Sequence, residues 1–447
     1  MRQSFWQIAG NYRSDARRRH TVLRIFALCV SGASVLAGCA ADLPARPAEP
    51  VVIAQPRAEA LACPALPPAP VCPELPPPTT EPLPPPEDPR ALLAPADIRQ
   101  IPGWEQDNFA EALDAFRKSC PALLGQKSWN RVCGLADAAA GDAARAGAFF
   151  GQEFDAFQVL AFATESPIGT VTGYYEPLLM GSRVRTPRFK FPLYAPPQDL
   201  ITVDLSALHP DLKHRRLRGR LEGNRLVPYF SREDIEGDKK PLKGLELVWV
   251  DDAVESLFLQ IQGSGQIQFE NGERIRVGYA DQNGHPFRGI GGLLVRRGEL
   301  KLGNASMQGI KNWAQRNPKK VQQYLNANPS YVFFRELPTD LPGPLGALGV
   351  PLTAERSVAI DPRVVPLGAP VFLATTYPVS ARPLQRLMMA QDTGGAIVGP
   401  ARADFFWGFG DAAGQQAGRM KQNGNMWVLL PKGYDLSTLP STVKVRK

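Results

Sequence analysis

The sequence predicts a mainly β fold that follows a short block of helices, and three observations lead to this fold class. Apolar residues recur at helical spacing between residues 108 and 118. After Gly169, apolar and polar residues alternate in short segments bounded by glycine, asparagine and proline, which is typical of strands. The composition, 44% hydrophobic and 21% charged over 447 residues, excludes a wholly disordered chain.

The first 38 residues have the pattern of a lipoprotein signal peptide. Six arginines precede a mostly apolar stretch at residues 25–36, and Leu36-Ala37-Gly38 stands directly before Cys39. This arrangement resembles the bacterial lipobox, in which Cys39 would become the lipidated first residue. Ala40, and not aspartate, follows, which favours the outer membrane over the inner one. An ordinary signal peptide and an uncleaved anchor are the alternatives.

The formal charge changes if this segment is removed. It holds six arginines and one aspartate, so the net charge falls from +8 to +3. The basic character of the whole chain therefore gives no reason to expect a nucleic-acid partner. No stretch approaches 18 uninterrupted apolar residues, which excludes a protein with many membrane spans.

Residues 39–97 are expected to form a proline-rich tether. They hold 18 of the 44 prolines, and proline lacks the N–H that helices and sheets require. Such a stretch is typical of a semi-rigid spacer, so we expect the folded part to begin near residue 98. A proline-rich ligand for a binding domain is the alternative.

The cysteines after Cys39 fit an exported protein. Sequence proximity suggests two disulfides, Cys63–Cys72 and Cys120–Cys133, although four cysteines allow three connectivities. The spacings lack paired Cys-x-x-Cys units, so we expect no zinc site, and no metal or cofactor in general.

Helices are expected in two parts of the chain. The first part covers residues 108–118 and continues as helices through residues 128–164. The second covers residues 304–326, with Asn304 or Ser306 as its cap and Pro318 opening a second helix.

Strands are expected elsewhere, and they suggest a small β-barrel or sandwich. Residues 246–269 and 273–280 alternate between apolar and polar side chains. After Pro329 the chain is interpreted as an all-β block with tight turns, in which Asp411 would cap a short helix.

Three aspartates in this last block are the main candidates for chemistry. Asp361, Asp392 and Asp404 each close a short apolar strand, where a plain core would place valine or isoleucine. A single aspartate at a strand end is often only a turn former. Three of them together favour a functional site.

The motifs around these residues resemble a known family. IDPRVVPLG, QDTGGAIVGP and RADFFWGFG resemble the three-aspartate domain of bacterial cell-wall enzymes. Together with GYYEPLL at 173–179 and IQGSGQI at 261–267, the set is similar to the membrane-bound lytic murein transglycosylase A family, over about residues 100–435.

The resemblance implies an enzyme that cleaves the β-1,4 bond between N-acetylmuramic acid and N-acetylglucosamine in peptidoglycan. The muramic acid 6-hydroxyl attacks its own anomeric carbon and gives a 1,6-anhydro end. The implied fold is a double-psi β-barrel with a second, smaller β domain inserted. In this sequence the barrel would comprise residues 98–185 and 342–447, and the insert residues 186–341.

The resemblance also assigns roles to residues. Asp404 matches the single catalytic aspartate, and Asp392 and Asp361 match two supporting ones. One carboxyl group can suffice because it first protonates the leaving oxygen and then takes the proton of the 6-hydroxyl, and the apolar residues that follow Asp404 would raise its pKa. On a strand, Phe406 would share the face of Asp404, while Trp407 would point into the core.

The expected glycan contacts come from motifs before, within and after the insert. They are Thr172, Tyr174, Tyr175, Gln262, Ser264, Gly394 and Gly395, with Tyr279 as a weaker candidate. Gly394 and Gly395 would let the backbone approach a ligand closely. The strand period allows one tyrosine of the pair Tyr174–Tyr175 to face the glycan.

Two other functions compete with the lytic one. A water-using muramidase would need a second carboxylate about 5–9.5 Å from the first, for which Asp392 or Glu176 could serve. A lipid-anchored protein that only holds peptidoglycan would need no acid. The expected partners are peptidoglycan glycan strands, the outer membrane through the lipid anchor, and a cell-wall synthesis complex.

Overall fold

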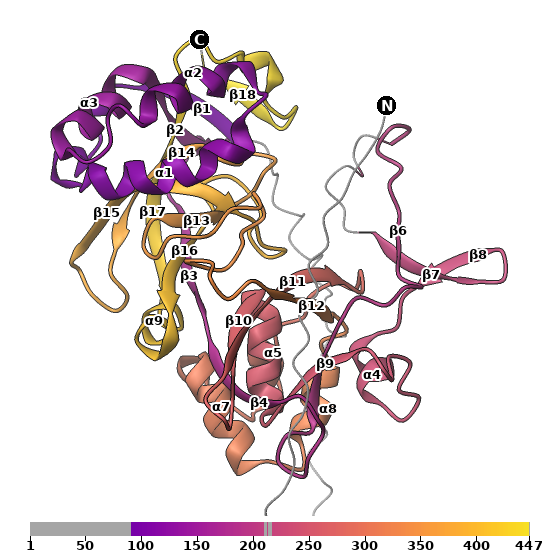
Figure 1. The fold of residues 1–447 in the computed structure, drawn as a ribbon. Helices are drawn as coiled ribbons and strands as arrows, with labels where there is room; N and C mark the ends of the chain where they lie inside the picture. The colour runs from indigo at the N-terminus through magenta and orange to yellow at the C-terminus, as the bar shows by residue number, and fades with distance from the viewer. Residues whose placement is uncertain (1–90, 210–211, 213–216, 447) are drawn as a thin grey trace, which may run out of the picture. The chain divides into compact units, whose positions relative to one another are not determined.

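The computed structural model describes residues 91–209, 212 and 217–446. The expected signal peptide, the lipidation site Cys39, the pair Cys63–Cys72 and most of the proline-rich tether lie outside the described residues. Within them the protein is mainly β with additional helices, as the sequence predicts (Figure 1).

The largest unit is a nine-stranded sheet with the order β14-β15-β13-β16-β3-β17-β2-β1-β18 among the described residues. An additional pairing joins β14 to β17, so six of these strands, from β14 to β17, pair in a closed cycle. The strands are β1 (Ala91–Ala96), β2 (Phe154–Ala161), β3 (Gly169–Glu176), β13 (Ser357–Ile360), β14 (Pro370–Thr376), β15 (Pro383–Asp392), β16 (Ala403–Phe409), β17 (Lys421–Pro431) and β18 (Val443–Val445).

The first strand corrects the expected start of the folded part. β1 lies within the segment assigned to the tether, yet it pairs with β2 and with β18, and Ala91 and Leu93 are fully buried. Pro95 occupies the end of this strand. The prolines before it concealed the apolar run Ala91-Leu92-Leu93-Ala94, which is what the sheet buries.

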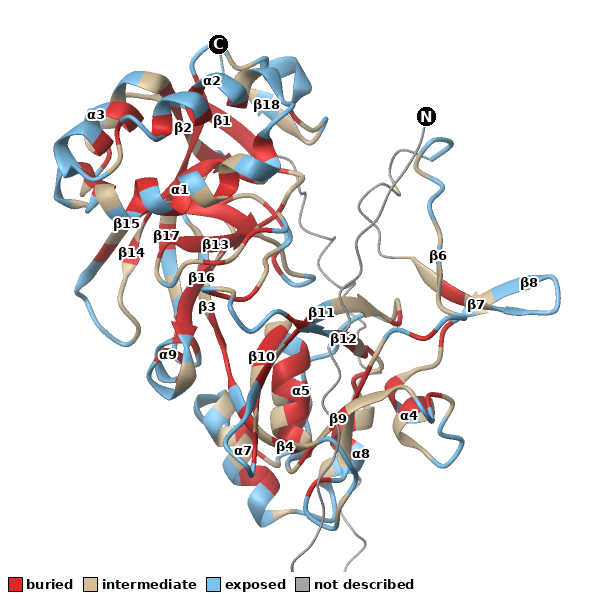
Figure 2. Cartoon of the chain, in the orientation of Figure 1, coloured by how far each residue is buried: buried red, intermediate tan, exposed pale blue. Residues whose placement is uncertain are grey.

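Three helices pack on this sheet, namely α1 (Phe109–Leu123), α2 (Lys127–Ala136) and α3 (Ala143–Glu153). A disulfide between Cys120 and Cys133 joins α1 to α2, which is the pairing expected from their proximity. The rings of Phe116, Phe150 and Phe154 contact one another in edge-on and tilted arrangements where the helices meet the sheet. Figure 2 shows many buried residues in the strands of this region.

The expectation of helices as far as residue 164 was wrong. The chain leaves α3 at Glu153 and forms β2 at once. β2 pairs with β17 on one side and β1 on the other, and most of its side chains are buried. Its apolar residues at 154, 157 and 160 fit a helix by spacing alone, so the sequence period could not show the long-range pairing.

A second, six-stranded sheet has the order β12-β11-β10-β4-β9-β5 among the described residues. The strands are β4 (Leu178–Ser182), β5 (Phe191–Tyr194), β9 (Glu246–Val250), β10 (Ser264–Phe269), β11 (Arg274–Gln282) and β12 (Val332–Leu337), and a small sheet is formed by β6 (Ile201–Thr202), β7 (Arg218–Glu222) and β8 (Arg225–Pro228). The helices of this part are α4 (Arg232–Glu236), α5 (Ala253–Gln262), α6 (Ile290–Arg296), α7 (Met307–Arg316) and α8 (Val321–Asn326).

The chain passes between the two large sheets earlier than expected. β3 ends at Glu176 in the nine-stranded sheet and β4 begins at Leu178 in the six-stranded one, whereas the expected boundary lay at 185/186. The return runs from Leu337 to Ser357, and this segment contains the expected boundary at 341/342.

One predicted strand is instead a helix. Residues 253–262 form α5, although the alternation over 246–269 indicated strands throughout. Asp252 caps this helix by accepting hydrogen bonds from the N–H groups of Val254 and Glu255, and Gly263 ends it in the left-handed conformation. In the other helical region Ser306 is the cap, because its hydroxyl accepts from the N–H of Gly309.

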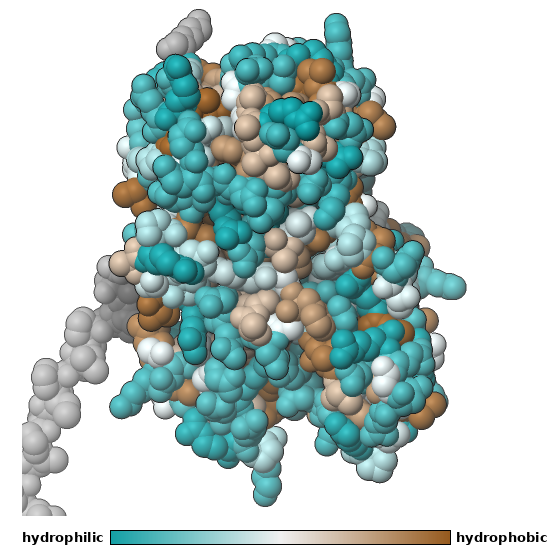
Figure 3. Space-filling view, turned by 60° about the vertical axis from the view of Figure 1, so that its left-hand side comes forward, coloured by the Kyte–Doolittle hydropathy of each residue, from teal (hydrophilic) through white to brown (hydrophobic). Residues whose placement is uncertain are grey.

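The last block is also not entirely β. Residues Gly410–Ala417 form α9 between β16 and β17. Asp411 lies in the first turn of α9 and makes no side-chain cap, so its expected capping role was wrong. The surface seen in Figure 3 is mainly hydrophilic, with apolar residues in scattered areas.

Candidate active site

Four neighbouring strands place Asp392, Ala359, Asp404 and Thr172 in one row. Ala359 of β13 is paired with Asp392 of β15 on one side and with Asp404 of β16 on the other. Asp404 is in turn paired with Thr172 of β3. Residues paired directly across strands project to the same face of a sheet, so the two carboxyl groups share one face.

Asp404 is an acid with a strongly perturbed pKa. Its Oδ1 accepts a hydrogen bond of 2.5 Å from the hydroxyl of Thr172, and its side chain is partly buried. Burial raises the pKa of Asp404 to about 6, while the Thr172 hydrogen bond and the charge of Arg402 lower it and the charge of Asp392 raises it further. Near neutral pH, Asp404 can therefore exist in both the acid and the base form.

An apolar cluster accounts for this loss of solvation. Tyr174, Leu352, Ala359, Ile397 and Phe406 form a buried group that comes from β3, β13, β16 and the loops beside them. Phe406 lies two residues after Asp404 on the same strand face, as expected from the strand period. The ring of Tyr174 lies 5.1 Å from that of Phe406, measured between centroids.

Trp407 points to the opposite side and belongs to the core, as the period indicates. Its Nε1 donates to the sulfur of Met420 at 3.3 Å, and its ring lies 4.6 Å from that of Phe405. Gly173 faces this ring, because a Cβ at that position would lie 2.6 Å from Trp407 Nε1.

Asp392 has donors on both of its oxygens. Oδ2 accepts from the hydroxyl of Tyr174 at 3.0 Å, and Oδ1 accepts from the backbone N–H groups of Ala347 and Thr393, each at 2.9 Å. These bonds hold Asp392 as a fixed acceptor beside Asp404. Burial, followed by the charges of Asp392 and Asp404, raises the pKa of Tyr174 well above its usual value, so Tyr174 stays a donor.

Asp361 holds a loop. It is 3% exposed and accepts from the N–H of Gly399 at 2.7 Å and from the backbone and guanidinium of Arg363. Burial acts to raise the pKa of Asp361, but the hydrogen bonds from Arg363 and Gly399 outweigh it and lower the pKa. Asp361 thus ties the end of β13 to the loop that leads into β16.

Gly394 and Gly395 lie in the loop after β15, next to Asp392. A Cβ on Gly394 would lie 2.7 Å from the side chain of Ile397, which is part of the apolar cluster around Asp404. Gly395 is exposed. The structure therefore brings both glycines to the side of the row that carries Asp392.

The two adjacent tyrosines point in different directions. Tyr174 joins the row, whereas the ring of Tyr175 is 5% exposed and packs against Gly414 of α9, where a Cβ would lie 2.7 Å from the ring. The backbone N–H of Tyr175 donates to Oε1 of Gln262 at 3.0 Å. The pair thus behaves as the strand period predicts, with one tyrosine beside the aspartates.

Gln262 lies at the end of helix α5, and not on a strand as its motif suggested. Ser264, two residues later, begins β10 and is 7% exposed. Tyr279 lies opposite them on β11, 38% exposed, and its N–H donates to the carbonyl of Gly263. Of these three residues, Gln262 contacts β3 directly, because it accepts from the N–H of Tyr175 near the end of that strand.

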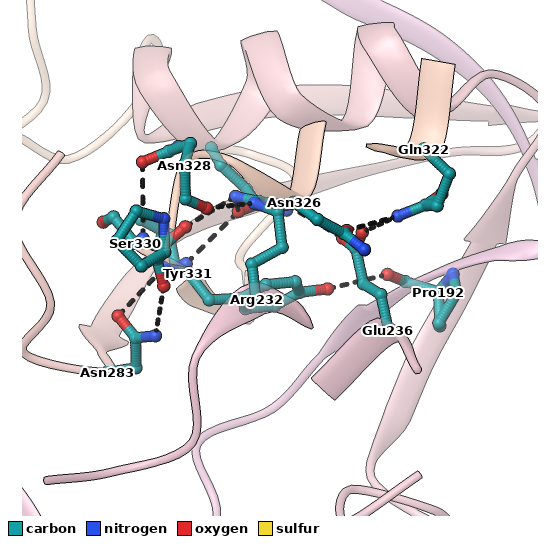
Figure 4. A network of polar contacts seen from close by, with 12 residues as sticks. Pro192, Arg232, Glu236, Asn283, Gln322, Asn326, Asn328, Ser330 and Tyr331 are labelled. Atoms are coloured by element: carbon teal, nitrogen blue, oxygen red, sulfur yellow. Dashed lines mark hydrogen bonds and ion pairs between the residues drawn. The ribbon is translucent and has the colours of Figure 1, made fainter. Parts of the chain in front are cut away.

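A buried arginine, Arg232, binds a residue of helix α5 and belongs to the polar network drawn in Figure 4. Arg232 is 1% exposed, and its guanidinium donates to Gln260 Oε1 and to the carbonyls of Asn328 and Ser330. It also pairs with Glu236 at 2.8 Å. Gln260 lies two residues before Gln262, so this network holds the end of α5 that contacts β3.

Sequence reasoning missed two participants. Arg402 Nη2 donates to the hydroxyl of Thr172 at 3.0 Å and so reaches Asp404 through that hydroxyl. Its position two residues before Asp404, directly ahead of β16, was the available signal. Ala347, which donates its N–H to Asp392, acts through its backbone, and no side-chain pattern could have shown it.

The described residues contain no metal-binding cluster and no helix that could span a membrane. In the described part of the chain, no three or more histidine, cysteine, aspartate or glutamate residues lie together in a way that could hold a metal ion. Among the same residues, every helix is too short or too polar to cross a membrane.

Two family models match the chain. One, described as the MltA specific insert domain, matches residues 170–335, and the other, the 3D domain, matches residues 356–430. The membrane-bound lytic murein transglycosylase A of Escherichia coli K12 is 32% identical over 331 residues, which is 72% of this chain and 81% of that protein.

Solved structures agree with these matches. MltA from Neisseria gonorrhoeae is 42% identical, with a TM-score of 0.67, over 76% of this chain and 93% of that one. MltA from Escherichia coli with bound chitohexaose is 29% identical, with a TM-score of 0.54, over 76% of this chain and 91% of that one.

Proposed function

We propose, for a chain that belongs to the membrane-bound lytic murein transglycosylase A family and is a peptidoglycan lytic transglycosylase, that Asp404 is its single acid and base. The observation that carries this proposal is the pKa of Asp404, raised to about 6 by burial beside an Asp392 whose oxygens both accept hydrogen bonds. One carboxyl group is thus able to give and to accept a proton, and the other is fixed.

The reaction needs only this one group. Protonated Asp404 gives its proton to the glycosidic oxygen as the bond from that oxygen to the anomeric carbon of N-acetylmuramic acid breaks. The resulting carboxylate takes the proton of the muramic acid 6-hydroxyl, whose oxygen bonds to the same carbon. The products are a free 4-hydroxyl on N-acetylglucosamine and a 1,6-anhydro end, and Asp404 is protonated again without added water.

The neighbours of Asp404 would adjust each half of this cycle. The Thr172 hydroxyl, oriented by Arg402, stabilises the carboxylate form of Asp404. Asp392, held by Tyr174 and by backbone N–H groups, disfavours that form by its charge. The balance of these effects keeps the proton transferable in both directions, and Asp361 supports the loop before β16.

Glycan binding is proposed at residues on both sides of the row. Gly394 and Gly395 would let the backbone approach the sugar, and Thr172 and Tyr174 offer hydroxyl groups beside Asp404. Gln262 and Ser264 would contact the glycan from the six-stranded part. Tyr175 would contribute through its position in the β3 backbone, since its ring packs against α9.

The finer architecture is also a proposal. We infer that the cycle of six paired strands is a double-psi β-barrel, formed by the segments before and after the insert, which were expected at 98–185 and 342–447. The extent of the first segment is better taken as 91–176, from the strands that share its sheet. The insert expected at 186–341 would then include β4.

The water-using alternative requires a second carboxylate that is free to activate water. Both oxygens of Asp392 accept hydrogen bonds, and Glu176 is 1% exposed and paired with Arg276. These contacts favour the intramolecular route. A protein that only holds peptidoglycan would have no use for an acid with a pKa of about 6.

We also propose that a lipid on Cys39 anchors the enzyme at the outer membrane, where it faces the periplasm. The supports are the lipobox resemblance and the words "membrane-bound" in the names of relatives. We further propose that the enzyme acts within a cell-wall synthesis complex, because new glycan strands can be inserted where an existing strand has been cleaved.

The test is the release of soluble muropeptides from isolated sacculi. We expect the Asp404→Asn variant to lose activity by at least 10³-fold, because Asn can neither give nor accept the required proton. Equal release by wild type and Asp404→Asn would show that Asp404 is not the acid.

A further inference from the structure

Two connections carry the chain between the nine-stranded and six-stranded sheets. The outgoing connection is the step from Glu176 at the end of β3 to Leu178 at the start of β4. The returning connection is the segment from the end of β12 at Leu337 to the start of β13 at Ser357. Both connections lead directly to residues of the aspartate row.

One guanidinium contacts both connections. Arg276 of β11 donates through Nε to Glu176 Oε1 at 2.7 Å, and through Nη1 to the carbonyl of Leu341 at 2.6 Å. A longer contact of 3.4 Å joins Nη1 to the carbonyl of Gly343. The side chain of Glu176 is 1% exposed and that of Arg276 11%, so these bonds are shielded from water.

The surrounding strands keep this contact in register. Gln266 of β10 is paired with Arg276 on one side and with Leu178 on the other, and its Nε2 donates to Glu176 Oε2 at 3.2 Å. Its backbone N–H donates to the carbonyl of Pro177 at 2.8 Å. The outgoing connection is therefore fixed to the same strands that carry Arg276.

Each connection continues into the site. Upstream of Glu176 on the same strand lie Tyr174, which donates to Asp392, and Thr172, which donates to Asp404. Downstream of Gly343 lie Ala347, whose N–H donates to Asp392 at 2.9 Å, and Leu348, whose N–H donates to the carbonyl of Gln391 at 3.0 Å. Tyr174 thus lies on the strand that leads into the outgoing connection, and Ala347 lies on the returning connection, and Arg276 joins these two connections.

We propose that Arg276 is a positioning residue that ties the two connections to each other and thereby holds Asp392 and Thr172 in place around Asp404. It acts at a distance, through Glu176 on one side and the carbonyls of Leu341 and Gly343 on the other. The proposal rests on the proposed role of Asp404.

Arginine suits this role and lysine does not. A guanidinium presents five donors in a planar fork, so it can bind a carboxylate and backbone carbonyls at the same time. A lysine at this position could pair with Glu176, yet its single ammonium would not span both connections. The comparison of the two side chains therefore separates bridging from mere neutralisation of a buried carboxylate.

The experiment compares Arg276→Gln and Arg276→Lys with wild type on soluble, uncrosslinked glycan strands. The rate is divided by the folded fraction measured by circular dichroism. We expect kcat to fall at least tenfold for Arg276→Gln and at least threefold for Arg276→Lys, with KM changed less than threefold in both. The matched control is Arg274→Gln, on the same strand, where the exposed Arg274 donates to Gln268 and bridges neither connection. Its kcat should stay within twofold of wild type.

Full activity of Arg276→Lys would overturn the proposal, because neutralising Glu176 would then be enough. A normal kcat in the double variant Glu176→Gln with Arg276→Met, which fills the same space without charge, would overturn it as well. Hydrogen exchange adds a local readout, since backbone N–H groups of residues 341–350 should lose protection in Arg276→Gln and keep it in Arg274→Gln.

The two proposals can fail separately. If Asp404→Asn stays active, the proposed role of Asp404 fails, whatever the Arg276 variants do. If Asp404→Asn is inactive and Arg276→Gln behaves like Arg274→Gln, only the positioning role is wrong.

Discussion

Asp404 and Asp392 stand on opposite sides of the same residue, Ala359, in three adjacent strands. Strands lie about 4.8 Å apart, so the backbones of the two aspartates are about 10 Å apart. Each carboxyl group still affects the other, because the charge of Asp392 adds to the raised pKa of Asp404. Asp404 can therefore carry the proton, while the charge of Asp392 adjusts the pH at which it does so.

The pH dependence of catalysis should show the acid form of Asp404. Its pKa is raised to about 6, so the fraction that carries the required proton falls as the pH rises through that value. We expect kcat/KM on glycan strands to decline on the alkaline side with an apparent pKa near 6. A profile that stays flat from pH 5 to pH 8 would contradict the assignment.

Replacement of Thr172 should move this alkaline limb to higher pH. The Thr172 hydroxyl bond lowers the pKa of Asp404, and Thr172→Val removes it while keeping the shape of the side chain. Thr172→Ser, which keeps the hydroxyl, is the matched control and should retain the wild-type limb. The pH profile of kcat/KM measures both variants, and a limb that moves to lower pH in Thr172→Val would refute the argument.

Replacement of Asp392 should move the limb in the opposite direction. The charge of Asp392 raises the pKa of Asp404, and Asp392→Asn removes that charge while an amide oxygen remains to accept from Tyr174 or Ala347. We expect the alkaline limb to shift to lower pH, with kcat/KM at neutral pH reduced by roughly two- to tenfold because fewer molecules carry the proton. An unshifted limb would mean that the two carboxyl groups do not interact.

Asp404 should also lower the stability of the fold at neutral pH. The pKa of Asp404 is raised from 3.8 in the unfolded chain to about 6 in the folded protein, so folding favours the protonated form. The contribution of this protonated form to the free energy of unfolding is lost as the pH rises through 6. Asp404→Asn avoids this loss, so we expect it to be more stable than wild type by about 1–3 kcal/mol at pH 8. Near pH 4 the difference should largely disappear, as urea unfolding at the two pH values would show.

Asp361 should behave in the opposite way. Its folded pKa is lowered, so its contribution to stability is present above the unfolded pKa and is lost as the pH falls below about 4. Asp361→Ala leaves the N–H of Gly399 and the guanidinium of Arg363 without their acceptor, and we expect it to cost about 2–4 kcal/mol at pH 7. A thermal unfolding midpoint equal to that of wild type would show that this carboxylate does not hold the loop.

Much of the site was predictable because its chemistry lies in compact motifs. Asp361 follows the end of β13 and Asp392 ends β15, as expected, whereas Asp404 lies near the start of β16, so the expectation that it closes a strand was wrong. The strand period correctly separated Phe406 from Trp407. The same period separated Tyr174 from Tyr175. Local sequence determines which face of a strand a side chain takes, and these inferences needed nothing else.

What the sequence could not show depends on contacts between distant segments. Strand β1 was hidden among prolines, and β2 was interpreted as helix, because only pairing with β17 and β18 makes these segments strands. Helix α5 was interpreted as a strand, because the alternation of apolar and polar residues gave a stronger signal than the capping residue Asp252. The sequence could not single out Arg276, because its contacts with Glu176 and Leu341 form only where the two connections meet.

The end group of the products tests the central claim most directly. Sacculi digested with the wild-type protein would be analysed by mass spectrometry for the muramic acid terminus. The single-aspartate route predicts 1,6-anhydro ends, which lack one water compared with reducing ends, and predicts none with Asp404→Asn. Reducing muramic acid ends as the main product would contradict this account and favour the water-using muramidase.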